Sequence, residues 1–117
     1  MKDSILLTKS KAFALRVVRL YKYLRERKES VIAKQMLQSG TSIGANIAES
    51  RYAQSKTDFA SKLQIALKEA AETEYWLDLL RDSELVESSL AFDSLLADCI
   101  ELVKLLTSSI KTAKTNA

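Results

Sequence analysis

The feature that most restricts the fold is a three- and four-residue spacing of apolar residues that recurs in four segments of the chain. It is strictest near the carboxyl end, where steps of four and three alternate along Phe92, Leu96, Cys99, Val103, Leu106 and Ile110. This spacing places the apolar side chains on one stripe of an α-helix and is typical of helices that pack in bundles. Proline, which breaks helices, is absent from the 117 residues. The sequence therefore predicts an all-α protein.

The same spacing predicts four helices, over about residues 5–28, 31–52, 56–82 and 89–114. Long amphipathic helices with short connections favour an antiparallel up-and-down four-helix bundle. Serines, which are preferred at the start of helices, stand before the last three segments as Ser30, Ser55 and Ser88 or Ser89. We expect residues 1–117 to form a single domain around one core.

The second predicted helix contains small and polar residues in its second half. Gly40, Gly44 and Ala48 repeat at four-residue steps, although glycine inside a helix costs about 1 kcal/mol relative to alanine. Small residues at this spacing indicate that another helix approaches closely. We interpret Asn46 and Glu49, which lie beside them, as partly buried groups whose hydrogen bonds join neighbouring helices.

The third predicted helix is apolar on two faces, whereas a helix in a small bundle needs only one apolar stripe. The second face favours a partner subunit as its cover, and large aromatic rings such as that of Trp76 are enriched at interfaces. On the first helix, two apolar residues lie opposite the core stripe. The candidate oligomer interface therefore comprises Leu15, Val18, Ile65, Glu72, Trp76 and Leu79.

Charge is unevenly distributed along the chain, whose net charge is +3. Residues 1–38 contain ten Lys or Arg and three Asp or Glu, a net charge of +7, whereas residues 69–101 contain ten acidic residues and one arginine, a net charge of −9. The basic side chains of the first helix form a candidate nucleic-acid-binding surface of Lys9, Lys11, Arg16, Arg19, Lys22 and Arg25. Two alternatives remain open for these residues, a solvated face and pairing with the acidic region between subunits.

The composition excludes most catalytic chemistry. The chain has no histidine and one cysteine, which rules out His-based acid–base catalysis, Ser-His triads and zinc sites. Cys99 lies on the apolar stripe of the last helix, so we interpret it as a core residue. The pairs Glu69–Glu72 and Asp98–Glu101 lack the histidine that follows such carboxylates in di-iron bundles. We therefore predict no catalytic residue, cofactor, metal site or small-molecule substrate, and hence a protein that is not an enzyme.

Three features of the sequence indicate the cellular compartment of the protein. Its first residues lack the apolar core of a signal peptide, and no apolar run approaches the roughly 18 residues of a membrane span. A single cysteine allows no internal disulfide. We expect a cytoplasmic protein without a membrane partner.

The run S-I-G-A-N-I-A-E at residues 42–49 resembles the S-I-x-A-N-I-A-E signature of the 23S rRNA intervening-sequence proteins, a family of bacterial four-helix bundles. Residues 55–59 resemble the S-x-x-[ED]-F step of this family, and residues 66–77 resemble the segment that leads into its paired glutamates. The resemblance covers about residues 8–112. Gly44 stands where proline is frequent in the family, and Ser50 stands where glycine is frequent. We take as the structural signature Gln35, Ser42, Ile43, Gly44, Asn46 and Glu49.

The resemblance implies a bundle that assembles into a ring, typically a homopentamer, without enzymatic activity. The chain is also similar to the accessory variability proteins of diversity-generating retroelements, which bind nucleic acid and a reverse transcriptase through a basic surface. These likenesses imply an oligomeric module that binds RNA or nucleoprotein. The alternative is a protein-interaction scaffold whose basic and acidic faces serve only ring assembly.

Overall fold

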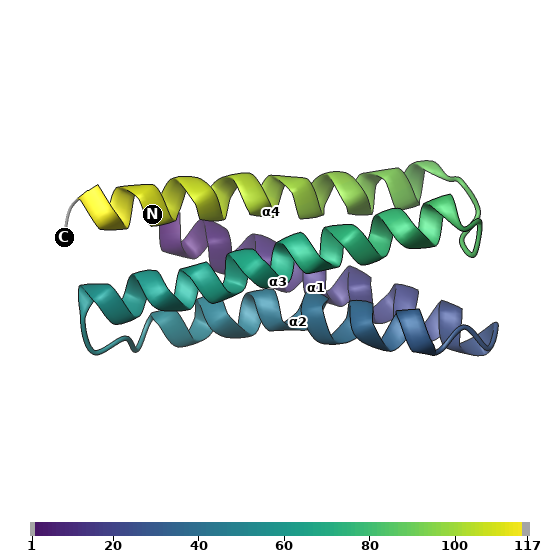
Figure 1. The fold of residues 1–117 in the computed structure, drawn as a ribbon, viewed down its shortest axis with the longest axis horizontal. Coiled ribbons are helices and arrows are strands. Elements are labelled where there is room, and N and C mark those ends of the chain that lie inside the picture. Colours follow the sequence, from purple (N-terminus) through teal and green to yellow (C-terminus); the bar gives the residue numbers. More distant parts are fainter. Residues whose placement is uncertain (1, 116–117) are drawn as a thin grey trace.

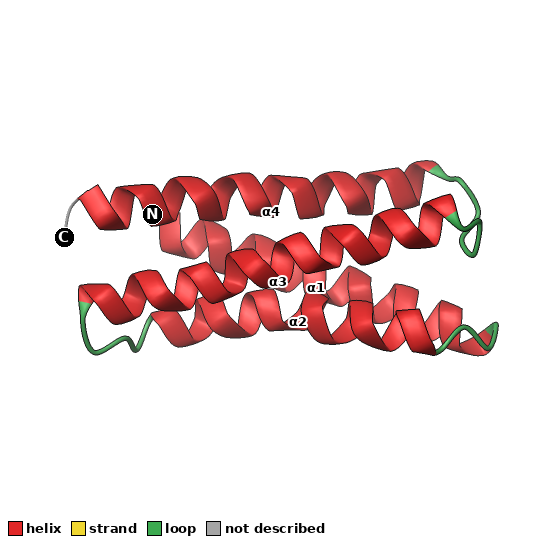
Figure 2. Ribbon diagram, viewed as in Figure 1, coloured by secondary structure: helices red, strands yellow, loops and turns green. Residues whose placement is uncertain are grey.

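The computed structural model describes residues 2–115 and places most of them in four α-helices (Figure 1). The helices are α1 (Lys2–Glu26), α2 (Val31–Ser50), α3 (Lys56–Asp82) and α4 (Leu90–Thr115). No strand occurs in this part of the chain, and three short connections join the helices (Figure 2). The all-α prediction is confirmed, and each helix begins and ends within three residues of the expected position.

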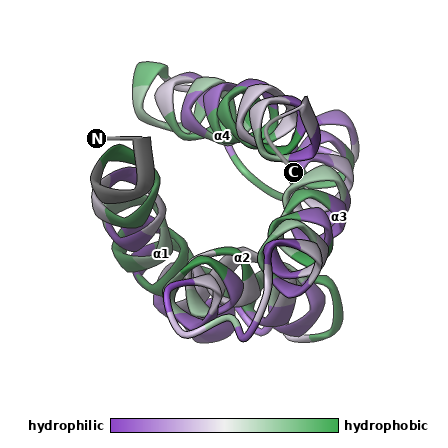
Figure 3. Ribbon diagram, turned by 90° about the vertical axis from the view of Figure 1, so that its left-hand side faces the viewer, coloured by the Kyte–Doolittle hydropathy of each residue, from purple (hydrophilic) through white to green (hydrophobic). Residues whose placement is uncertain are grey.

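Successive helices run antiparallel. The α1–α2 and α3–α4 connections lie at one end of the bundle, and the α2–α3 connection lies at the other end with both chain ends (Figure 1). In the end view the helices surround the core in chain order, so α4 returns to lie beside α1 (Figure 3). Among the described residues the Cα atoms of α1 do not come close to those of α3, nor those of α2 to those of α4, so these two pairs are the diagonals of the bundle. The fold is therefore the predicted antiparallel four-helix bundle.

The core forms where the four apolar stripes meet. Its fully buried side chains include Phe13, Leu24, Met36, Ile43, Leu63, Leu77, Leu102 and Leu106. The buried face of α4 is slightly rotated from the predicted one, because Leu102 is buried while Val103 is only half-buried. Every buried side-chain nitrogen and oxygen in the described part of the chain has a hydrogen-bond partner.

Two of the predicted serine caps are confirmed. Ser55 Oγ accepts a hydrogen bond from the Asp58 N–H at 3.0 Å, and Ser89 Oγ accepts one from the Phe92 N–H at 3.0 Å. Ser30 precedes α2 but makes no side-chain hydrogen bond to the helix. The starts of α3 and α4 are thus fixed by side chains, as their sequences indicate.

The glycines of α2 lie where α1 crosses it. A Cβ atom on Gly40 would lie 2.9 Å from Val17 Cγ1, and one on Gly44 would lie 3.3 Å from Ser10 Oγ. Real side chains essentially never approach as closely as the first of these distances. The predicted close approach of a second helix is therefore confirmed, and the approaching helix is α1.

The interpretation of Asn46 and Glu49 was wrong in two respects. Asn46 Nδ2 donates to the Ser42 carbonyl at 2.9 Å, one turn earlier in α2, and so joins no second helix. Glu49 is exposed rather than partly buried, although it does reach α3, where Lys62 Nζ lies 3.2 Å from its Oε1. The side-chain hydrogen bond buried between α2 and α3 instead runs from Thr73 Oγ1 to Ser39 Oγ, at 2.8 Å.

Candidate nucleic-acid interface

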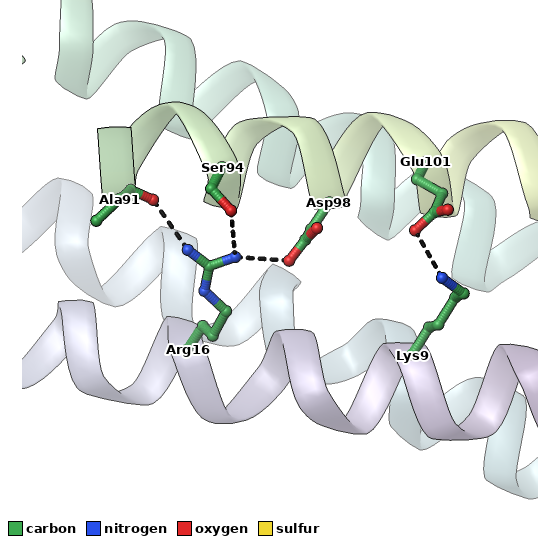
Figure 4. A network of polar contacts seen from close by, with 6 residues as sticks. All are labelled: Lys9, Arg16, Ala91, Ser94, Asp98 and Glu101. Carbon is green, nitrogen blue, oxygen red and sulfur yellow. Dashed lines mark hydrogen bonds and ion pairs between the residues drawn. The ribbon is translucent and has the colours of Figure 1, made fainter. Parts of the chain in front are cut away.

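The six basic residues predicted on the first helix divide into two groups. Lys9 and Arg16 reach across to α4 (Figure 4). Lys9 Nζ lies 3.1 Å from Glu101 Oε1, and Arg16 Nη1 lies 2.6 Å from Asp98 Oδ2. The same guanidinium donates to Ser94 Oγ at 3.2 Å and to the Ala91 carbonyl at 2.9 Å. Part of the basic region is therefore paired with part of the acidic region inside one chain.

The other four residues, Lys11, Arg19, Lys22 and Arg25, are exposed. None of them forms an ion pair with another residue that the structure describes. Guanidinium and ammonium groups without a carboxylate partner remain free to contact an anionic ligand. These four residues, rather than all six, form the candidate interface.

Two apolar residues share the outward face of α1 with three of these cations. Steps of four and three place Lys11, Leu15, Val18, Lys22 and Arg25 on one stripe, which we call the outer α1 stripe. Leu15 is 49% exposed, whereas Val18 is half-buried. From the sequence we expect the apolar pair to make subunit contacts and the cations to bind nucleic acid. The structure places the apolar pair and three of the cations on one face.

The remaining candidate interface residues lie on α3. Ile65 is 40% exposed, and Trp76 and Leu79 are half-buried. Trp76 Nε1 donates to Glu72 Oε2 at 3.0 Å, which places the indole N–H at the surface beside an exposed carboxylate. Because α1 and α3 lie on a diagonal of the bundle, Ile65, Glu72, Trp76 and Leu79 form a second surface, which we call the outer α3 stripe. The structure does not bring the two halves of the predicted interface together.

The signature residues have mainly structural surroundings. Ile43 is buried in the core, and Gly44 lies against Ser10 of α1. The polar members follow steps of seven, four and three along one side of α2, and they are Gln35, Ser42, Asn46 and Glu49. Gln35 is exposed and Ser42 is half-buried. The ion pair of Glu49 with Lys62 shows that this side of α2 faces α3.

A pocket that the sequence did not indicate lies between α1 and α4. It has a volume of about 410 Å³ and is bounded by the second half of α1, the α3–α4 connection and the first turns of α4. Its lining consists of Arg16, Arg19, Leu20, Tyr23, Val86, Glu87, Ser89, Ala91, Phe92 and Leu95. We call it the α1–α4 pocket. Its position depends on how α1 and α4 are aligned, which the spacing within either helix does not reveal.

The groups with shifted pKa values have no catalytic arrangement. Burial, with smaller effects from the charges of Glu74 and Asp78, raises the pKa of the Cys99 thiol to about 12, and Sγ contacts the Ala70 carbonyl at 3.3 Å. Partial burial and the neighbouring charge of Glu72 raise the pKa of Glu69, against a smaller opposite effect of Lys68. A thiol that stays protonated is a poor nucleophile.

The described residues contain no candidate metal-binding cluster and no candidate membrane-spanning helix. Between residues 2 and 115 no three His, Cys, Asp or Glu side chains gather into a group that suits a metal ion. The helices described in that range also lack a stretch long and apolar enough to cross a membrane. The described residues also line other surface pockets, among them one of about 410 Å³ at the α2–α3 connection, which includes Ser50, Arg51 and Phe59.

Comparison with known proteins identifies relatives of the chain. A family model described as the 23S rRNA-intervening sequence protein matches residues 2–108. A solved structure, of a protein with unknown function from the S23 ribosomal protein family of Bacteroides thetaiotaomicron VPI-5482, is 54% identical. The match covers 95% of this chain and 99% of that one, with a TM-score of 0.90. A comparison with curated proteins finds no match. Neither description names an enzymatic activity.

Proposed function

The chain belongs to the family of 23S rRNA-intervening sequence proteins, and from this premise we propose that it is a non-enzymatic, cytoplasmic module that binds RNA or nucleoprotein. One observation carries the proposal. Lys11, Arg19, Lys22 and Arg25 are exposed on α1 and form no ion pair with the described residues. Lys9 and Arg16, in contrast, are engaged with α4.

The geometry of α1 suits a phosphate backbone. Arg25 follows Lys11 by 14 positions in the helix, a distance of about 21 Å at roughly 1.5 Å per residue. A row of cations of this length can contact several successive phosphates, and each contact releases counterions from the nucleic acid. Binding should therefore weaken steeply as the salt concentration rises.

The test is a fluorescence-anisotropy titration of a structured RNA at about 50 and 200 mM salt. With four phosphate contacts the logarithm of the affinity should fall with a slope of about −3 against the logarithm of salt, or about fiftyfold over this range. The triple variant Lys11→Ala, Lys22→Ala, Arg25→Ala should reduce the slope to about −1. Absence of binding at about 50 mM salt would overturn the proposal.

A matched control lies on α4. The triple variant Lys104→Ala, Lys111→Ala, Lys114→Ala removes the same number of charges from exposed positions of another helix. It should keep the wild-type slope. Equal losses in both triple variants would mean that only net charge matters, and that α1 carries no interface.

The proposal includes assembly into a homo-oligomer, with a pentamer favoured by the family likeness. Exposed apolar side chains on the outer α1 and α3 stripes support it, because Leu15 and Ile65 are 49% and 40% exposed. On α1 the subunit contact would be made by Leu15 and Val18, and the three cations of the same stripe would border this contact and stay open to RNA. Two different surfaces on diagonal helices suit a head-to-tail contact, which closes into a ring when the rotation allows.

Light scattering on two variants tests this arrangement. Leu15→Asp places a charge in the outer α1 stripe, and Ile65→Asp places one in the outer α3 stripe. Each variant alone should therefore be a monomer. A mixture of the two retains one intact pair of surfaces and should form dimers. A monomeric wild-type protein would contradict the oligomer, and variants of unchanged mass would contradict these surfaces.

The alternative function is a scaffold in which charged faces serve only assembly. Arg19→Glu distinguishes it, because Arg19 has no partner among the described residues whose loss would disturb the fold. A changed oligomer size with no RNA binding by the wild-type protein would favour the scaffold.

A further inference from the structure

The α1–α4 pocket differs from the rest of the basic surface because its floor is apolar. Phe92 and Leu95, which are 5% and 4% exposed, reach it from the core, and Leu20 and Val86 are half-buried beside them. A volume of about 410 Å³ lies within the roughly 300–1,000 Å³ typical of small-ligand pockets. The pocket can therefore take up a flat apolar group of modest size.

The rim of the pocket carries cations and an aromatic ring. Tyr23 and Arg19 stand one helical turn apart on α1, and the Arg27 guanidinium lies 4.6 Å from the centre of the Tyr23 ring. Arg16 is held in place by its contacts with Asp98, Ser94 and Ala91 (Figure 4). Glu87 is the acidic residue of the lining, and it lies on the α3–α4 connection, across the pocket from α1.

The long polar side chains between α1 and α4 explain why the space is open. Of the four pairs of neighbouring helices, α1 and α4 make the sparsest contact. Besides Asp98, the α4 residues that meet Arg16 are Ala91 and Ser94, whose side chains are small. An open space can therefore remain beside the contact between Arg16 and α4.

From these features we infer that the α1–α4 pocket receives an unpaired nucleobase, so that the RNA partner is single-stranded where it meets α1. This inference rests on the proposed function. Unpaired bases are bound in proteins by stacking on aromatic rings and arginine planes, whereas bases in a duplex are inaccessible. Arg19 borders the pocket and belongs to the set of four unpaired cations, so a base in the pocket would have its phosphates beside these cations.

The experiment compares two RNAs of equal length and charge at about 100 mM salt. One is a perfect duplex, and the other is a hairpin with an unpaired purine loop. Wild-type protein should bind the hairpin at least tenfold more tightly, in line with the contribution of one stacked base. Tyr23→Ala should remove this preference by deleting the ring. Ala91→Trp should also remove it, by filling the pocket from an exposed position without a change of charge.

The control variant is Tyr52→Ala. Tyr52 is 83% exposed and lies in the α2–α3 connection, at the opposite end of the bundle. It should leave the preference for the hairpin intact. Circular dichroism should show all three variants folded, because each changes a residue on the surface.

The outcomes separate the two proposals. A preference that is lost in Tyr23→Ala and Ala91→Trp but kept in Tyr52→Ala supports the base pocket. Equal, steeply salt-dependent binding of duplex and hairpin by the wild-type protein overturns the pocket and leaves the proposed function standing. Absence of binding to either RNA overturns both.

Discussion

The two contacts that α1 makes with its neighbouring helices differ in kind: close packing against α2 and polar side-chain contacts with α4. Against α2 it packs on Gly40 and Gly44, where an added Cβ would lie 2.9 Å from Val17 Cγ1 and 3.3 Å from Ser10 Oγ. Against α4 it is joined by Arg16 and Lys9, and a pocket remains beside Arg16. Close packing specifies the position of a helix, because interiors tolerate little change in volume. A contact through long polar side chains leaves space for a ligand.

The largest effect is expected from breaking the α1–α2 contact. Gly40→Val would place two methyl groups into Val17, whose Cγ1 already lies 2.9 Å from an ideal Cβ. Overpacking of this kind costs about 3 kcal/mol of the free energy of unfolding, measured by urea denaturation. Ala45→Val, at an exposed position of the same helix, should cost about 0.5 kcal/mol. Equal losses would show that the proximity of α1 is irrelevant.

Breaking the α1–α4 contact should have a smaller effect. Arg16→Ala removes the ion pair with Asp98. The side chains of Arg16 and Asp98 are 30% and 45% exposed, so solvent screening limits the loss in the free energy of unfolding to about 1 kcal/mol. The difference from wild type should shrink at about 1 M salt. Lys9→Ala, which removes a more exposed pair, is the comparison and should cost less. A loss as large as that of Gly40→Val would contradict the contrast between the two contacts.

The smallest effect concerns Glu69, a half-buried carboxyl of α3 that lies outside both contacts. Burial and Glu72 raise its pKa above the ordinary value near 4.5. The folded protein therefore binds this proton more tightly than the unfolded chain, and stability falls as the pH rises through the window just above 4.5. Glu69→Gln should raise Tm slightly at pH 7 and leave it unchanged near pH 4. A gain of the same size at both pH values would exclude titration as its cause.

Much of the fold follows from spacing alone. The apolar steps in each segment predict helices, their order and their buried faces, because a buried stripe must repeat with the helical period. Gly40 and Gly44 likewise predict that another helix closely approaches α2, but they do not indicate that this helix is α1. Which helix approaches α2 depends on how the four helices are arranged around the core.

Less of the candidate site could be predicted from the sequence. The pairing of Arg16 with Asp98 joins residues 82 positions apart, and it depends on the alignment of two helices that do not follow one another in the chain. The α1–α4 pocket depends on the same alignment. The prediction that Asn46 joins two helices was wrong for a different reason. A side-chain amide inside a helix can donate a hydrogen bond to the carbonyl one turn earlier as readily as to a second helix.

The start of α1 and the end of α4 lie at the same end of the bundle, and the two helices are neighbours (Figures 1 and 3). One added connection, from α4 to α1, would therefore join all four helices into a closed ring. A flexible linker between the ends, with new ends cut within residues 27–30, would make α1 follow α4 as a hairpin. The helix pair now held by ion pairs would then also be held by chain connectivity, at the modest entropic cost of a short loop.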